Sequence, residues 1–160
     1  MRKRSSYRPK GVRLDVMGYV MQSITPVTSH GSVVLDLRLK NHAALATLTQ
    51  GQATHADVDV LVAALNVMEV LKRHGFGVEY KDLVREGLNA LRDVKARGAE
   101  SGRFVLKAPE MAALNLAMEL HDAQLDAITI RDLEKALLVV YSELGGKKSG
   151  QSLTKEKNEH

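Results

Sequence analysis

The stretch THADVDVLVAALNVMEVLKRHG, residues 54–75, decides what kind of fold this chain adopts. Thr54 and Asp57 have the spacing of a capping box, in which each side chain binds the backbone N–H of the other residue. Cations at 72 and 73 and the glycine at 75 are typical of a helix end. Between these signals, apolar residues recur at the helical spacing, namely Val58, Leu61, Val62, Leu65, Met68 and Leu71. The stretch therefore predicts a long amphipathic helix.

Comparable signals predict helices on both sides of this stretch. Pro109 suits the first turn of a helix, and Thr129 and Asp132 repeat the capping-box spacing. Glycines at 98 and at 145–146 are the expected stops, and Asn41 is an expected N-cap. We expect helices over residues 14–24, 41–50, 80–97, 108–126 and 129–145. The predicted fold is all-α, a compact bundle of five to six helices.

Residues 32–40 have a different pattern. Leu35, Leu37 and Leu39 alternate with charged residues, and a period of two favours a strand. No partner strand is evident in the sequence, so a helix or an extended linker fits nearly as well. The bundle is therefore expected to contain at most one short extended segment.

The charge distribution divides the chain into an arm, residues 1–13, a helical domain, residues 14–146, and a disordered tail, residues 147–160. The chain has 23 basic and 19 acidic residues; six of the basic ones and none of the acidic ones lie in the arm, which leaves the remainder at −2 (17 − 19). Such an arm attracts nucleic acid, an acidic partner or a phosphorylated ligand, or else serves as a solvated tail. Its candidate binding residues are Arg2, Lys3, Arg4, Arg8, Lys10 and Arg13.

The predicted helix over residues 80–97 carries a second basic feature. At about 100° per residue, four cations fall close to one line, and Asp82, Glu86 and Asp93 form a separate acidic line. This segregation indicates either an anion-binding stripe or salt bridges to a neighbouring helix. We call the cations the basic stripe; they are Lys81, Arg85, Arg92 and Lys95.

His121 lies on an apolar seam of the predicted helix over residues 108–126. A core histidine that is hydrogen-bonded to a carboxylate or to the backbone is the favoured interpretation. A catalytic base and a polar specificity device at a helix interface are the alternatives. Glu119, Asp122 and Asp126 fall on the other side of this helix and are expected to be solvated.

Several classes of site and protein are disfavoured by the sequence. The chain has no cysteine, no glycine-rich phosphate loop and no GxSxG motif, so no cofactor is expected. His55, Asp57 and Asp59 could approach a metal, but carboxylates in a first helical turn are better explained by the helix dipole, so no metal is expected. No run is long enough to span a membrane and no apolar segment follows the basic start, so a cytoplasmic location is expected.

Three segments carry a resemblance to a known group of proteins: RKRSSYRPKG, KNHAALATLTQG and MELHDAQLDAITIRDLEKAL. With them the chain resembles small uncharacterised proteins of tailed phages and prophages of proteobacteria, over roughly residues 2–144. The resemblance includes no catalytic motif. It implies a phage protein that acts in the host cell, and small phage proteins of this kind often bind a host or defence component.

Together these observations predict a non-enzymatic, phage-encoded binding protein that neutralises or redirects a host or defence factor. It would contact a protein or sequester an anionic ligand such as a nucleotide. The alternative is a DNA-binding regulatory or architectural protein that uses the basic arm, although the acidic start of the helix at residue 54 disfavours a helix-turn-helix reader. The apolar residues of the last two predicted helices exceed what a small bundle covers, so a homodimer is also expected.

Overall fold

The computed structural model describes residues 20–21, 24–26 and 31–155, with side chains described up to residue 144. This part of the chain contains five α-helices and one 3-10 turn. They are α2 (Gly31–Thr49), α3 (His55–Arg73), η2 (Val78–Tyr80), α4 (Lys81–Ser101), α5 (Ala108–Ala127) and α6 (Ile130–Lys155). The predicted all-α class is confirmed. Of the helix expected over residues 14–24, residues 20, 21 and 24 are helical and most of the others lie outside the described residues.

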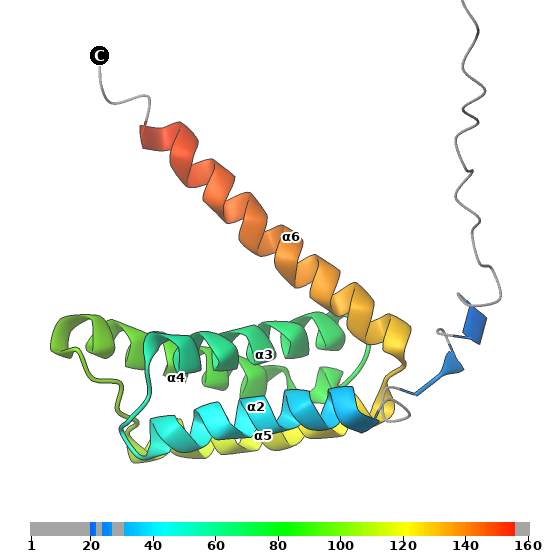
Figure 1. Cartoon of the computed structure of the whole chain (residues 1–160), viewed down its shortest axis with the longest axis horizontal. Coiled ribbons are helices and arrows are strands. Elements are labelled where there is room, and N and C mark those ends of the chain that lie inside the picture. Colours follow the sequence, from blue (N-terminus) through cyan, green and yellow to red (C-terminus); the bar gives the residue numbers. More distant parts are fainter. Residues whose placement is uncertain (1–19, 22–23, 27–30, 156–160) are drawn as a thin grey trace, which may run out of the picture.

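Helices α2 to α5 form a four-helix bundle, and α6 leaves it at an angle (Figure 1). Successive helices of the bundle are neighbours, and α5 returns beside α2, so the four helices close into a ring. Short connections between successive helices give antiparallel neighbours. Helix α3 contacts α2, α4, α5 and α6 and is therefore the centre of the fold.

The capping signals explain where α3 and α6 begin. Asp57 Oδ2 accepts a hydrogen bond from the backbone N–H of Thr54 at 2.7 Å, and Thr54 Oγ1 accepts one from the N–H of Asp57 at 3.4 Å. The bond from the Thr54 backbone lowers the pKa of the Asp57 carboxyl. Thr129 and Asp132 make the same pair of bonds, at 3.0 and 3.3 Å. Both predicted capping boxes are thus confirmed.

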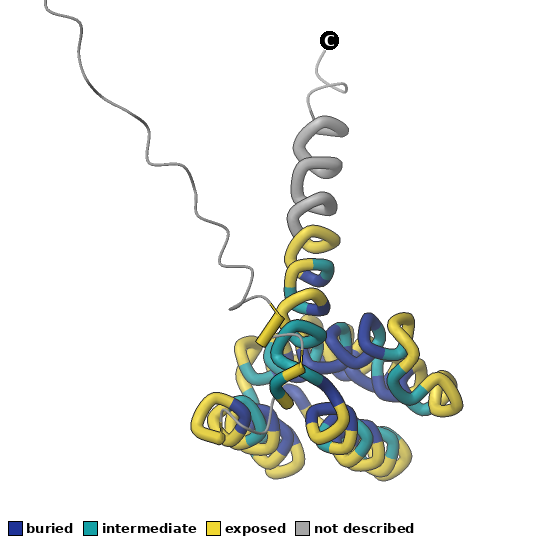
Figure 2. The backbone as a smooth tube through the Cα atoms, turned by 90° about the vertical axis from the view of Figure 1, so that its right-hand side faces the viewer, coloured by how far each residue is buried: buried dark blue, intermediate teal, exposed yellow. Residues whose placement is uncertain are grey.

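The buried side chains form two clusters, and Figure 2 shows along the backbone which residues are buried. The larger cluster fills the bundle between α2, α3, α4 and α5, around Leu48, Leu61 and Leu91. The smaller cluster joins the end of the bundle to the start of α6, through residues such as Leu71, Leu125 and Ala136. The second cluster therefore holds α6 in place beside α3.

The segment over residues 32–40 is helical, so the strand and linker interpretations are wrong. It continues without a break into the residues that follow, and Asn41 is a buried residue in the middle of α2 rather than an N-cap. Leu35 and Leu39, which suggested a strand by alternation, are both 65% exposed on the outer side of α2. The inward side is formed by Val34, Asn41, Ala44, Leu45 and Leu48, at the spacing of a helix.

Two predicted helix ends are also wrong. Helix α4 continues past Gly98 to Ser101 and ends at Gly102, which has the left-handed conformation that suits glycine (φ 72°). Gly98 is instead buried, and a Cβ there would overlap the ring of Phe104. Helix α6 continues past residues 145 and 146 to Lys155, so it includes most of the segment expected to be a disordered tail; residues 156–160 lie outside the described residues.

Candidate ligand-binding site

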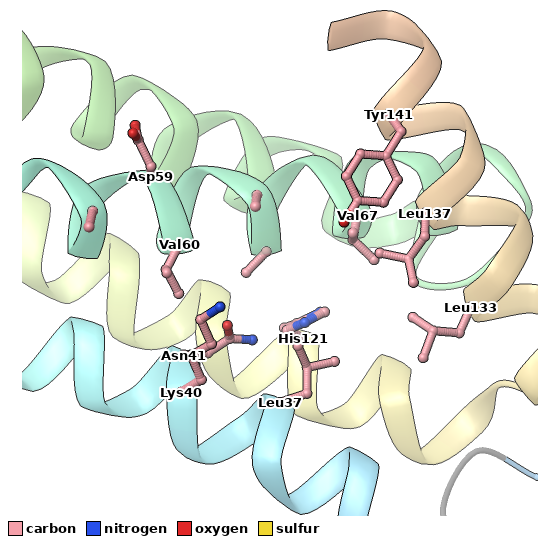
Figure 3. A pocket seen from close by; sticks show the side chains of 13 residues that line it. Leu37, Lys40, Asn41, Asp59, Val60, Val67, His121, Leu133, Leu137 and Tyr141 are labelled. Atoms are coloured by element: carbon pink, nitrogen blue, oxygen red, sulfur yellow. The ribbon is translucent and has the colours of Figure 1, made fainter. Parts of the chain in front are cut away.

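A cavity of about 480 Å³ lies between α2, α3, α5 and α6 (Figure 3). This volume is in the range of pockets that hold small molecules in proteins. We call it the central pocket. It borders the smaller core cluster, and α6 forms one of its walls. Its lining combines a large apolar surface with a few polar side chains, the usual composition of a ligand pocket.

Asn41 is the deepest polar residue that α2 contributes to the pocket. It is 2% exposed, and its Nδ2 has no hydrogen-bond partner among the described residues. A buried donor without a partner costs roughly 1–3 kcal/mol of folding free energy. The amide therefore lowers the stability of the empty fold, and an acceptor placed in the pocket would offset this cost.

His121 contributes the second buried polar group, from α5. It is 1% exposed, and its Nδ1 has no hydrogen-bond partner among the described residues. Burial lowers the pKa of His121 to about 4, against the opposing effect of the Asp122 carboxylate. The imidazole is therefore neutral at pH 7. Its position in the core is as predicted. A side-chain hydrogen bond with Gln124 also acts on its pKa, in the raising direction, whereas no carboxylate or backbone partner is found for Nδ1 among the described residues.

The other walls of the pocket are apolar. Val60 and Val67 line it from α3, together with the small side chains of Ala63 and Ala64. Leu133, Leu137 and Tyr141 line it from α6. Figure 3 shows Asn41 and His121 on one side of the cavity and these apolar groups from α3 and α6 on the others. A ligand in this space would meet polar groups at one side and hydrocarbon around the rest of its surface.

Two charged residues stand at the rim of the pocket. Lys40 precedes Asn41 on α2, is exposed, and has no ion-pair partner among the residues that the structure describes. Asp59 lies on α3, and its Oδ1 is 2.7 Å from Lys95 Nζ. Because Lys95 balances Asp59, the excess charge at the rim is the single positive charge of Lys40.

An ion-pair network behind the polar side of the pocket fixes α2 against α5. Arg38 Nη2 donates to the backbone oxygen of Asp122 at 3.0 Å and to Asp126 Oδ1 at 2.5 Å. His42 Nε2 lies 2.8 Å from Asp122 Oδ2. Asp122 and Asp126 are thus paired across the helix interface. Glu119 and Asp126 are exposed, as expected, whereas Asp122 is partly buried by its contacts with α2. Sequence spacing could not identify this network, because its partners are more than 70 residues apart.

The basic stripe lies on the outer side of α4, and three of its four cations have acidic neighbours. Arg85 Nη2 is 2.6 Å from Asp82 Oδ1, Lys95 pairs with Asp59, and Arg92 Nε is 3.8 Å from Asp93 Oδ1. Lys81 is exposed at the first position of α4, without an ion-pair partner in the described part of the chain. The Lys95 pair matches the salt-bridge interpretation, and anion binding by the stripe stays a prediction.

The residues considered for a metal site have other roles. Asp57 caps α3, Asp59 pairs with Lys95, and the ring of His55 packs edge-on against Phe104 with centroids 4.6 Å apart. Within the described ranges, no three His, Asp or Glu side chains come close enough to hold a metal ion. The candidate residues of the arm, in residues 1–13, lie outside the described residues.

Comparison with known proteins adds no relative: no family model, no curated protein and no solved structure matches this chain. Among the described helices, none is long and apolar enough to cross a membrane. The function must therefore be argued from the geometry of the pocket. Sequence reasoning identified His121 but missed Asn41 and Lys40, because it placed Asn41 at a helix end and left residues 32–40 unassigned.

Proposed function

We propose that the protein is a non-enzymatic binding protein and that it holds a small molecule in the central pocket. One observation carries this proposal: two buried side chains that line a mostly apolar cavity, those of Asn41 and His121, each have a nitrogen atom without a hydrogen-bond partner among the described residues. An unfilled cavity and a buried polar atom without a partner each lower the stability of a fold. A bound molecule would fill the cavity and provide hydrogen-bond partners for the two nitrogen atoms.

The chemistry of His121 favours binding over acid–base catalysis. A general base works best when its pKa is near the working pH. The pKa of His121 is about 4, so its neutral ring is a weak base at pH 7. It serves better as a fixed hydrogen-bonding group that orients a ligand. Together with the resemblance to phage proteins, this supports a protein that sequesters a molecule of the host cell.

Binding of a neutral apolar dye, N-phenylnaphthylamine, tests this proposal. We expect one dye per chain, with a rise in dye fluorescence. The substitution Ala63→Phe fills the pocket from an exposed position of α3 and should abolish binding. Ala96→Phe adds the same side chain at an exposed position of α4, outside the pocket lining, and should leave binding intact. Equal binding by both variants would contradict the proposal.

The alternative function, DNA binding through the basic arm, rests on the six cations and the absence of carboxylates in residues 1–13. Phosphate contacts make binding to duplex DNA fall steeply with salt. Deletion of residues 2–13 should abolish such binding without changing the dye affinity, because the arm and the pocket would be separate sites. An unchanged affinity for duplex DNA after the deletion would show that the arm does not bind DNA.

A further inference from the structure

The polar groups of the central pocket specify the kind of molecule that would fit, provided that the proposed function holds. Asn41 Nδ2 and Lys40 Nζ are both donors, and they come from adjacent residues of α2. Asn41 is buried and Lys40 is exposed, so one donor lies in the depth of the pocket and the other at its rim. A ligand that meets both needs two acceptor atoms held close together.

The charge at the rim of the pocket further limits which chemical group of a ligand would fit. Asp59 is balanced by Lys95 at 2.7 Å, whereas Lys40 has no ion-pair partner among the described residues. One uncompensated cation beside a buried amide matches a group with a single negative charge. A phosphate dianion would require more cations and backbone N–H groups than this apolar pocket provides, as phosphate sites in proteins show. A carboxylate has the required charge and two acceptor oxygens.

The remaining lining requires an apolar body. Val67 on α3 lies beside Leu137 on α6, near Leu133 and Tyr141, and Val60 lies farther along α3 on the side of Asn41 (Figure 3). We infer that the central pocket binds an amphiphilic monocarboxylate, with its carboxylate on Asn41 and Lys40 and its hydrocarbon part between α3 and α6. His121 lies beside the carboxylate end, where its neutral ring contributes one further hydrogen-bonding atom.

Matched probes of one shape and different charge test this inference. Calorimetric titration would compare naphthoate, naphthamide and naphthylmethylamine, which share an aromatic body and carry a negative, no and a positive charge at pH 7. We expect naphthoate to bind about tenfold more tightly than naphthamide, since a charge-assisted hydrogen bond is stronger than a neutral one, and naphthylmethylamine to bind most weakly. Octanoate and octanamide form a second pair, which distinguishes a fatty-acid body from an aromatic one.

Two substitutions test whether Lys40 causes the preference for a carboxylate over an amide. Lys40→Met keeps the length of the side chain and removes its charge, so it should lower naphthoate affinity about tenfold and leave naphthamide affinity unchanged. Lys135→Met, at an exposed position of α6 outside the pocket lining, is the matched control and should change neither affinity. Thermal unfolding of both variants would show that they remain folded, because Lys40 and Lys135 are exposed.

The outcomes separate this inference from the proposed function. If N-phenylnaphthylamine binds in the pocket but neither acid binds more tightly than its amide, the pocket is a binding site without carboxylate preference, and the inference is wrong. If the acids are preferred but Lys40→Met and Lys135→Met behave alike, the carboxylate is not held at Lys40, and the inference is again wrong. If no dye, acid or amide binds, the proposed function fails and the inference with it.

Discussion

Asn41 shows how one residue can lower stability and provide function. Its amide is buried in the middle of α2, where a leucine of similar shape would leave no donor unsatisfied. Gln124 on α5 is buried to a similar degree, but its Nε2 donates to the backbone oxygen of Phe76 at 2.9 Å and points at that of Met68 at 3.4 Å. The amide nitrogen of Gln124 thus supports the fold, although its Oε1 has no partner among the described residues, whereas the amide nitrogen of Asn41 has no such bond and its side chain lines the pocket.

Leucine substitutions at these two positions should therefore have opposite effects on stability. We expect Asn41→Leu to leave the free energy of unfolding unchanged or to raise it by about 1 kcal/mol, because it removes an unsatisfied donor. Gln124→Leu should lower it by about 1–3 kcal/mol, because the backbone oxygen of Phe76 loses its donor. Urea unfolding at pH 7 measures both. Destabilisation of equal size in the two variants would show that the Asn41 amide has a structural role.

His121 should make stability depend on pH. Its pKa is about 4 in the folded protein and about 6.5 in the unfolded chain, so below pH 6.5 the unfolded chain takes up a proton that the folded state does not. Stability should consequently fall as the pH drops from 6.5 to 4, by roughly 3 kcal/mol.

The non-titrating variant His121→Gln provides the comparison for this effect. Urea unfolding at pH 7, 5 and 4 should show that the wild type loses more stability than the variant over this interval. Other groups, such as the carboxyls of Asp57 and Glu110, titrate in both proteins and cancel in the difference. Above pH 7 the two curves should run parallel. Equal losses from pH 7 to 4 would mean that His121 accepts a proton in the folded state.

At the scale of the helices, the sequence predicted those elements whose ends are marked by local chemistry. The capping boxes at 54 and 129 and Pro109 marked three helix starts correctly. The start of α2 was missed because Arg38 and Asn41 interrupt its inward face with polar residues, and this hid the helical period. Arg38 contacts α5 and Asn41 lines the pocket, and a local sequence pattern cannot reveal such contacts between distant segments.

Glycine was the other source of error, because it ends a helix in one place and permits close packing in another. Gly98 fits within α4 because the Phe104 ring, which arrives from the following loop, occupies the space of a side chain. Ring and glycine are six residues apart, and the contact depends on how that loop folds back. From the sequence alone, a packing glycine and a terminating glycine look the same.

Gly98→Ala should therefore reverse the usual effect of this substitution. Alanine in place of glycine normally favours a helix by about 1 kcal/mol, but here the methyl group would overlap the Phe104 ring. Overpacking of this kind costs about 1–3 kcal/mol, and we expect a lower free energy of unfolding. Gly31→Ala, at the open start of α2, is the control and should be neutral or stabilising. Stabilisation by Gly98→Ala would show that the ring moves away freely.

At the scale of the whole molecule, the apolar surface is unevenly distributed. The seam of α5, expected to face a second copy, is covered by the chain's own helices, with Leu114, Met118 and Leu125 all buried. On α6, however, Leu138 and Tyr141 are 70% and 69% exposed, and Leu144 is also exposed. The predicted homodimer, if it forms, would therefore use α6 and not α5.

Light scattering at micromolar concentration measures the oligomeric state. We expect a mass of two chains for the wild type and of one chain for Leu138→Glu, because a buried, unpaired carboxylate at a dimer interface is strongly unfavourable. Leu116→Glu changes an exposed leucine on α5 and should leave the dimer intact. A wild-type mass of one chain would show that the outer face of α6 has no partner copy.

The angle at which α6 leaves the bundle has a mechanical consequence (Figure 1). Leu133 and Leu137 line the central pocket near one end of α6, while the helix extends to Lys155 at the other. At 1.5 Å per residue, its 26 residues span about 39 Å. A tilt of about 10° at the pocket end would carry the last turn through roughly 7 Å. If a ligand drew α6 closer to the pocket, the helix would act as a lever, because a small tilt at the pocket end becomes a large displacement of the far end.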